Sequence, residues 1–151
     1  MKKILFVCLG NICRSPSAEM IMKKLINDVG LMHQFYIESA GTSRSQVGNP
    51  IYPHSKQKLV EKNIPVDENK KSRIITGEDY DKFDYIIAME IDNIRYIQNI
   101  IGNRDKKINC LMDYTDNPRD IADPWYTRDF ELAYNEIYEG CNKLLEYLRS
   151  I

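Results

Sequence analysis

Short apolar runs alternate with segments of helical periodicity along the whole chain. The runs of strand length cover residues 3–8, 35–40, 83–89 and 108–112. Apolar residues recur at helical spacing in the segments 17–29, 55–63, 92–101 and 129–149. Strands that alternate with helices predict an α/β fold in which a parallel sheet is flanked by helices on both faces. The chain has 151 residues, 43% of them hydrophobic, so we expect one domain over residues 1–151.

Charge and hydropathy argue against several classes of protein. Lys and Arg total 21 against 22 for Asp and Glu, so the net charge of −1 disfavours a general nucleic-acid or membrane-surface binder. The N-terminal apolar run is too short for the core of a signal peptide, and no stretch reaches the length of a membrane span. Without an export signal, the four cysteines are expected to be reduced thiols. We therefore expect a cytoplasmic protein with no nucleic-acid or membrane partner.

The first predicted strand ends at Cys8 and leads through a short loop into the first predicted helix. Ser15 followed by Pro16 predicts the helix start, because serine is a good N-cap and proline is tolerated in the first turn. Ligands of open parallel α/β sheets bind beyond the carboxyl ends of the strands. A loop here can turn backbone N–H groups toward an anion, aided by the helix dipole. The predicted phosphate-binding loop consists of Leu9, Gly10, Asn11, Ile12, Cys13, Arg14 and Ser15.

Cys8 and Arg14 would give this loop its chemistry. Arg14 offers a bidentate fork that suits two phosphate oxygens. The inward N–H donors would also stabilise a thiolate at Cys8, and the thiolate is the nucleophilic form of cysteine. Ser15 is placed to donate a hydrogen bond to the sulfur, and Asn11 to brace the loop. A lone cysteine at the end of a buried strand is usually a core residue. The pattern Cys-x5-Arg-Ser between a strand and a helix favours a nucleophile instead.

Motifs along the chain resemble those of one known family. The sequence VCLGNICRSP around Cys8 resembles the signature of the low-molecular-weight protein tyrosine phosphatases. The resemblance continues with SAGT at 39–42, FDYIIAM followed by DN within 83–93, and DPWY at 123–126. It implies a four-stranded parallel sheet and a cysteinyl-phosphate intermediate. It also assigns Cys8 as nucleophile, Arg14 as phosphate clamp and Asp123 as general acid.

The chemistry itself requires an acid, because a tyrosyl oxygen leaves more readily when it is protonated. The long irregular stretch 113–127 holds four aspartates, Asp113, Asp116, Asp120 and Asp123. Residue type and position do not choose among them, and only the resemblance of DPWY selects Asp123. No metal or organic cofactor is implied, because Arg14, the loop N–H groups and the helix dipole can together offset the phosphate charge.

The resemblance also implies which side chains flank the substrate ring. Tyr126 is expected at the rim of the cleft, and Ile12 beside the ring. Trp125 is either a core aromatic or a second wall of the cleft, because large aromatic side chains are usually buried. The loop at 43–47 lacks the bulky aromatic that family members often carry after SAGT, and Tyr52 is expected to replace it in part.

Further roles also come from the resemblance. Ser39 and Asp84 are expected to support the phosphate loop, and Cys13 to form a reversible disulfide with Cys8 that prevents overoxidation. A passive thiol is the alternative for Cys13. The remaining cysteines and both histidines are expected in core, surface or capping positions rather than in a metal site: Cys110, Cys141, His33 and His54.

Three alternative activities are weighed against a tyrosine phosphatase. Phosphoarginine phosphatases resemble this loop but have Thr at the position of Ile12, and an apolar side chain suits a phenyl ring better than a guanidinium. Thioredoxin-coupled arsenate reductases need a further redox-active cysteine pair, which Cys110 and Cys141 do not provide. A non-catalytic phosphate-binding module would have no use for a thiol beside Arg14. We therefore predict hydrolysis of phosphotyrosine in proteins, by a monomer or weak homodimer.

Overall fold

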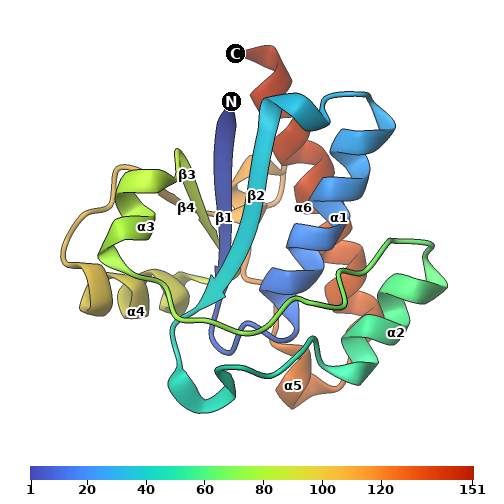
Figure 1. The fold of residues 1–151 in the computed structure, drawn as a ribbon, viewed down its shortest axis with the longest axis horizontal. Helices are drawn as coiled ribbons and strands as arrows, with labels where there is room; N and C mark the ends of the chain where they lie inside the picture. The colour runs from blue at the N-terminus through green and yellow to red at the C-terminus, as the bar shows by residue number, and fades with distance from the viewer.

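A computed structural model describes residues 1–151 and contains one four-stranded sheet whose strands are all parallel (Figure 1). The sheet order is β2-β1-β3-β4, with β1 (Lys2–Cys8) and β2 (Phe35–Gly41) paired along their whole length. β3 (Tyr85–Ala88) and β4 (Ile108–Cys110) complete it. The predicted fold is confirmed. The carboxyl ends of the strands meet at the lower edge of the sheet in Figure 1, opposite both chain termini.

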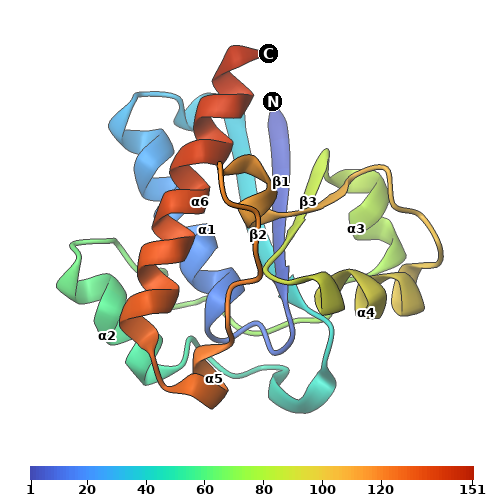
Figure 2. The same ribbon diagram turned by 180° about the vertical axis from the view of Figure 1, so that it is seen from behind.

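Helices cover both faces of this sheet. Figures 1 and 2 show α1, α2 and α6 on one side and α3 and α4 on the other. Their bounds are α1 Arg14–Asp28, α2 Pro53–Glu61, α3 Gly77–Lys82, α4 Ile91–Ile101, α5 Pro124–Thr127 and α6 Phe130–Ser150. Three short 3-10 turns are η1 (Met32–Gln34), η2 (Arg44–Gln46) and η3 (Leu111–Tyr114). The short helices α3 and α5 were not predicted, because they are too brief to show an apolar period.

The side chains of β1 alternate between two hydrophobic cores. Ile4, Phe6 and Cys8 join the larger core, which is formed with α1 and α6. Leu5 and Val7 join the smaller core, which is formed with α4. Each face of the strand is therefore buried, which explains why the sequence of β1 is an uninterrupted apolar run rather than an alternating one.

The start of α1 differs from the prediction. The helix begins at Arg14, its N-cap is Cys13, and no side chain caps it. The prediction that Ser15 is the N-cap is wrong, because Ser15 already lies in the first turn and its hydroxyl is directed to Cys8 instead. Pro16 is still tolerated, since the first helical N–H groups have no acceptor within the helix.

Gly41 is the last residue of β2. Because it has no side chain, the end of this strand can lie close to the loop after β1. A Cβ at this position would lie 2.8 Å from the Leu9 carbonyl oxygen and 3.0 Å from Asn11 Cβ. On its other side, Gly41 N–H donates to the Arg73 carbonyl at 2.7 Å. The chain between Ser72 and Ile75 and the loop after β1 are thus both held against Gly41.

A matched pair of glycine substitutions tests this packing. At Gly140 in α6, a Cβ would lie 2.5 Å from Leu111 Cγ, far from the loop after β1. We expect Gly41→Ala and Gly140→Ala each to lower the free energy of unfolding by about 1–3 kcal/mol. Only Gly41→Ala should also weaken binding of inorganic phosphate, because there the clash is with loop backbone. Denaturant unfolding and calorimetric titration measure both effects, and wild-type phosphate affinity in Gly41→Ala would contradict the expectation.

Candidate active site

The loop between β1 and α1 has its carbonyl groups bound from outside. Neighbouring segments donate to them in four hydrogen bonds: Thr42 N and Ser43 N to Leu9 O at 2.9 Å each, Ser72 Oγ to Gly10 O at 2.8 Å, and Tyr52 N to Ile12 O at 2.8 Å. The N–H groups of Gly10, Ile12 and Cys13 donate to no protein acceptor. An arrangement with carbonyls outward and N–H groups free is a nest that binds anions.

Cys8 lies at the base of this loop and is only 3% exposed. Its Sγ accepts hydrogen bonds from the backbone N–H of Asn11 at 3.3 Å and of Ser15 at 3.4 Å. The Ser15 hydroxyl lies 3.0 Å from the same sulfur and can donate a third. Donors that converge on a thiol stabilise its anionic form, which is the nucleophile.

Asn11 holds the loop in a conformation that non-glycine residues rarely adopt. Its φ is 55°, in the left-handed region that asparagine tolerates better than most residues. The buried amide donates to Ser15 Oγ at 2.8 Å and to Ser39 Oγ at 3.0 Å, and accepts from Arg73 N at 3.2 Å. Ser39 Oγ donates in turn to Glu19 Oε1 at 2.6 Å. The structure thus brings Asn11, Ser15 and Ser39 together beneath Cys8.

Asp84 lies elsewhere. Its carboxylate accepts a hydrogen bond from Lys3 N at 2.9 Å, at the amino ends of β1 and β3. The phosphate loop is at the carboxyl ends of these strands, so the prediction that Asp84 supports the loop is wrong.

Arg14 is only 1% exposed, and hydrogen-bond acceptors surround its guanidinium. It donates to Ile121 O at 2.7 Å, Glu90 Oε1 at 3.0 Å and Asp123 Oδ2 at 3.3 Å. Burial alone would lower the pKa of the guanidinium, but the negative charges of Cys8, Asp123 and Glu90 more than offset it, and the pKa is raised. Arg14 is therefore a fixed positive charge beside the Cys8 thiol.

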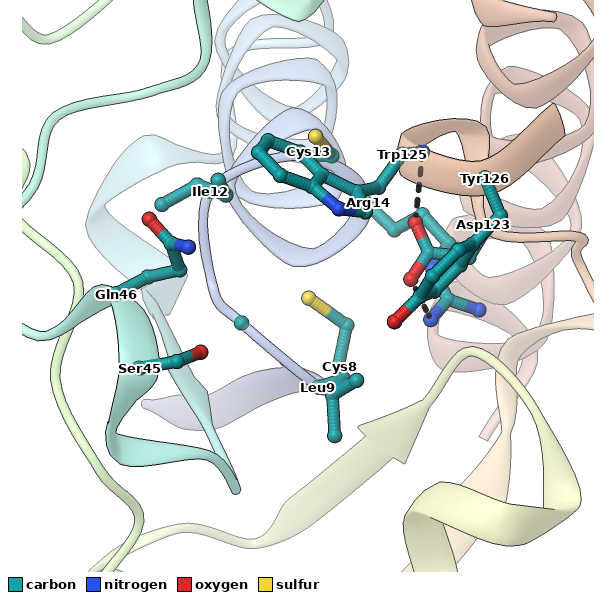
Figure 3. A pocket seen from close by; sticks show the side chains of 11 residues that line it. Cys8, Leu9, Ile12, Cys13, Arg14, Ser45, Gln46, Asp123, Trp125 and Tyr126 are labelled. Atoms are coloured by element: carbon teal, nitrogen blue, oxygen red, sulfur yellow. Dashed lines mark hydrogen bonds and ion pairs between the residues drawn. The ribbon is translucent and has the colours of Figure 1, made fainter. Parts of the chain in front are cut away.

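A pocket opens above Cys8, with walls from three segments (Figure 3). Its floor is the loop itself, one wall comes from η2, and the other comes from α5 and the residue before it. The lining residues are Cys8, Leu9, Gly10, Ile12, Cys13, Arg14, Ser45, Gln46, Asp123, Trp125 and Tyr126. Trp125 is 39% exposed and Tyr126 71%, so neither is a core aromatic.

Among the four aspartates of the stretch 113–127, Asp123 lines the pocket. Its Oδ1 caps α5 by accepting from Trp125 N at 3.0 Å, while Oδ2 faces Arg14. Asp113 accepts from Cys110 N and Asp120 from Ile91 N, each at 3.0 Å, and Asp116 is exposed. The structure therefore distinguishes Asp123 from the other three aspartates, which sequence position alone did not do.

Tyr52 supports a wall of the pocket and does not line it. Its ring makes an edge contact with Trp125, with the centroids 5.0 Å apart, and its hydroxyl accepts from Arg128 at 2.9 Å. Direct contact of Tyr52 with a substrate ring stays a prediction. Ser45 and Gln46 line the facing wall instead.

The Cys13 thiol points away from Cys8 in Figure 3. Burial raises its pKa to about 12. All four cysteines are free thiols, and Cys110 and Cys141 lie in the two cores as predicted.

His33 is exposed, and His54 stacks on Tyr52 with ring centroids 5.2 Å apart. No three His, Cys, Asp or Glu side chains are grouped to hold a metal ion, and no helix has the length and apolarity to span a membrane.

Several residues of the site were not predicted. Glu90 lies two residues after the end of β3, and its place beyond the carboxyl end of a strand is a signal that could have identified it. Ser72 and Arg73 carry no such signal, because they reach the loop only through the path of the chain across Gly41. Ser45 and Gln46 lie in a polar turn that has no distinctive pattern.

Comparisons with known proteins agree with this geometry. The YfkJ protein of Bacillus subtilis, described as a low molecular weight protein-tyrosine-phosphatase, is 38% identical over 148 residues, which cover 96% of this chain and 94% of YfkJ. Its crystal structure matches with a TM-score of 0.95 at 37% identity, covering 99% of this chain and 96% of that one. PtpA of Staphylococcus aureus, which has the same description, is 36% identical over 149 residues, covering 98% of this chain and 94% of PtpA.

An arginine phosphatase from Drosophila has the same fold. Its crystal structure matches with a TM-score of 0.86 at 31% identity, covering 98% of each chain. The sequence model described as low molecular weight phosphotyrosine protein phosphatase matches residues 3–150. The chain belongs to the low-molecular-weight phosphotyrosine protein phosphatase family of hydrolases.

Proposed function

We propose that this protein hydrolyses phosphotyrosine in proteins through a phosphorylated Cys8. The observation that carries the proposal is the convergence of three groups on one pocket: the Cys8 thiol, the free N–H groups of the loop and the Arg14 guanidinium. A phosphoryl group in that pocket would have a nucleophile beneath it and donors around it. Stabilisation of transferring charge by fixed donors is the main means by which such sites accelerate phosphoryl transfer.

In the first step, Cys8 Sγ attacks phosphorus and the bond from phosphorus to the tyrosyl oxygen breaks. The leaving oxygen takes a proton from Asp123, which lies on the wall of the pocket and beside Arg14. Protonation avoids expulsion of a free phenolate. The phosphoryl group is then bonded to Cys8, with its oxygens bound by the loop N–H groups and by Arg14.

In the second step, water attacks the phosphocysteine. Asp123, now ionised, accepts a proton from this water, and the bond from phosphorus to sulfur breaks to release inorganic phosphate. The sulfur leaves as a thiolate that accepts from Asn11 N, Ser15 N and the Ser15 hydroxyl. The donors that prepare Cys8 for attack therefore also make it a good leaving group.

The walls of the pocket support phosphotyrosine over phosphoarginine. Ile12, Trp125 and Tyr126 present apolar and aromatic surface around the entrance. A phenyl ring is stabilised by such surface, whereas a guanidinium would lose hydration without gaining a charged partner. The carboxylate of the pocket, Asp123, already faces Arg14 and caps α5.

Arsenate reduction is less well supported. It needs a second pair of accessible thiols to pass a disulfide outward. Cys110 and Cys141 lie in different cores, and burial raises the pKa of both thiols. Both are poor nucleophiles for such a relay.

We also propose that the enzyme acts in the cytoplasm, as a single domain and as a monomer or weak homodimer. A reducing compartment would keep the Cys8 thiol available. All lining groups of the pocket come from one chain, so a second copy is not needed to complete it.

Two substitutions test the mechanism, with a third as control. Cys8→Ser should abolish hydrolysis of a phosphotyrosine peptide, and Asp123→Asn should lower kcat roughly 10²-fold or more, because the leaving group is no longer protonated. Asp116→Asn, an exposed aspartate of the same loop, should match wild type. Steady-state kinetics under reducing conditions with a chelator measure all three, and wild-type kcat in Asp123→Asn would rule out its role as the acid.

The substrate is tested by comparing phosphotyrosine and phosphoarginine in peptides that are otherwise identical. We expect the wild type to hydrolyse phosphotyrosine with the higher kcat/KM. Ile12→Thr should lower this value roughly tenfold, because the substitution removes apolar contact with the ring. Higher kcat/KM for phosphoarginine in the wild type would overturn the substrate proposal and leave the phosphocysteine mechanism standing.

Reversible pairing of Cys8 with Cys13 stays a proposal. Peroxide would oxidise the Cys8 thiolate to a sulfenic acid, and attack by the Cys13 thiolate on that sulfur would form the disulfide and expel hydroxide, which takes up a proton from solvent to give water. Because the pKa of Cys13 is about 12, we expect this resolving step to be slow near neutral pH. Its rate should rise as the pH is raised above neutral, because the thiolate fraction of Cys13 grows as the pH approaches its pKa.

Peptide mass spectrometry after removal of peroxide measures the disulfide. Cys13→Ser is the control and should accumulate further oxidised Cys8 instead. Failure to form the disulfide at any pH would assign Cys13 the role of a passive thiol.

A further inference from the structure

Two arginines without ion pairs lie next to residues that form the two walls of the pocket. Of the eight arginines in the chain, five pair with carboxylates: Arg14, Arg73, Arg95, Arg104 and Arg119. The three others have no carboxylate within ion-pair distance, and they are Arg44, Arg128 and Arg149. Arg149 is at the end of α6, whereas Arg44 directly precedes the lining residue Ser45 and Arg128 donates to the carbonyl of the lining residue Trp125.

Arg44 begins η2, and the next two residues, Ser45 and Gln46, line the pocket. Figure 3 shows these two on the side of Cys8 opposite Trp125 and Asp123. Arg44 is exposed, and the hydrogen bonds of this turn join Ser43 and Ser45 without involving its guanidinium. Its charge therefore has no carboxylate partner within the chain.

Arg128 directly follows α5, on the other wall. Its guanidinium donates to Tyr52 Oη at 2.9 Å and to Trp125 O at 3.4 Å, and it lies over the rings of Tyr52 and Phe130, 5.4 Å and 5.1 Å from their centroids. These contacts hold the charge beside Trp125 and still leave N–H donors unused. Arg128 is thus a positioned cation.

Nearby carboxylates are engaged elsewhere. Asp129, next to Arg128, caps α6 by accepting from Leu132 N at 2.9 Å. Glu131 pairs with Lys58 and Lys62, and Asp123 with Arg14. We call Arg44 and Arg128 the rim; two unpaired positive charges there, on a chain of net charge −1, favour an anionic partner at this place and not over the whole surface.

We propose that Arg44 and Arg128 make the enzyme prefer phosphotyrosine that is flanked by acidic residues. This specificity rests on the proposed function and deepens it. A peptide that inserts its phosphotyrosine between the two walls must place its neighbouring residues over the pocket mouth. Aspartate or glutamate there would meet one arginine on each side. Arginine suits this role because its planar fork can bind a carboxylate through two N–H groups.

The test compares two phosphotyrosine peptides that differ only in their flanks, Asp and Glu in one and Asn and Gln in the other. We expect kcat/KM to be about tenfold higher for the acidic peptide at low ionic strength, because two exposed charge contacts each contribute modestly. The ratio should fall toward one as salt is added. Each ratio is taken within one variant, so a general loss of activity cancels.

Substitutions assign the preference to the two arginines. The double variant Arg44→Gln/Arg128→Gln should bring the ratio close to one, whereas Arg44→Lys/Arg128→Lys keeps both charges and should retain most of the preference. Arg149→Gln, which removes an unpaired arginine at the far end of α6, is the matched control and should keep the wild-type ratio. A wild-type ratio near one, or an unchanged ratio in the double Gln variant, would overturn the proposal.

A parallel series with phosphoarginine in the same flanks separates this inference from the proposed function. Hydrolysis of the phosphoarginine series alone, with the acidic preference present, would reject the phosphotyrosine substrate and keep the role of the rim. Hydrolysis of phosphotyrosine without the acidic preference would keep the phosphotyrosine substrate and reject the role of the rim. Absence of hydrolysis in both series would reject both proposals.

Discussion

The structure depends most on how the loop after β1 is held from outside. Donors from the segments around Thr42, Tyr52 and Ser72 bind its carbonyl oxygens, and these hydrogen bonds prevent its peptide groups from flipping. The N–H groups that remain face the Cys8 side. An anion site of this kind is in place before a ligand arrives, so binding does not have to order the loop. The closeness of Gly41 to the loop is part of the same constraint.

Arg14 is the second element that this arrangement fixes. A buried guanidinium is tolerated only when acceptors surround it, and Glu90, Asp123 and the Ile121 carbonyl fill that role. These contacts join the carboxyl end of β3 and the segment before α5 to the phosphate loop. The acid and the phosphate clamp are thereby placed relative to each other. The aromatic wall is placed by the same segment, because Asp123 also caps α5, which carries Trp125 and Tyr126.

The sequence predicted the parts of this account that depend on local pattern. The order of strands and helices follows from periodicity, and Cys8 and Arg14 follow from their place between a strand and a helix. Asp123 needed a family resemblance, because three other aspartates share its loop. The errors about Asp84 and Glu90 both concern β3. The phosphate loop lies beyond the carboxyl end of this strand, where Glu90 is, whereas Asp84 lies at the amino end. Ser72, Arg73 and Gln46 depend on how distant segments cross, which no local pattern encodes.

The central claim is that Cys8 carries the phosphoryl group during turnover. Rapid quenching of Asp123→Asn with an aryl phosphate whose leaving group needs no protonation, followed by peptide mass spectrometry, tests it most directly. Hydrolysis of the intermediate is slowed in this variant, because no carboxylate accepts the proton of the attacking water. We expect a phosphate adduct on the peptide that contains Cys8, and no adduct in Cys8→Ser. Turnover of substrate by the wild type with no adduct on Cys8 at any quench time in either enzyme would contradict it.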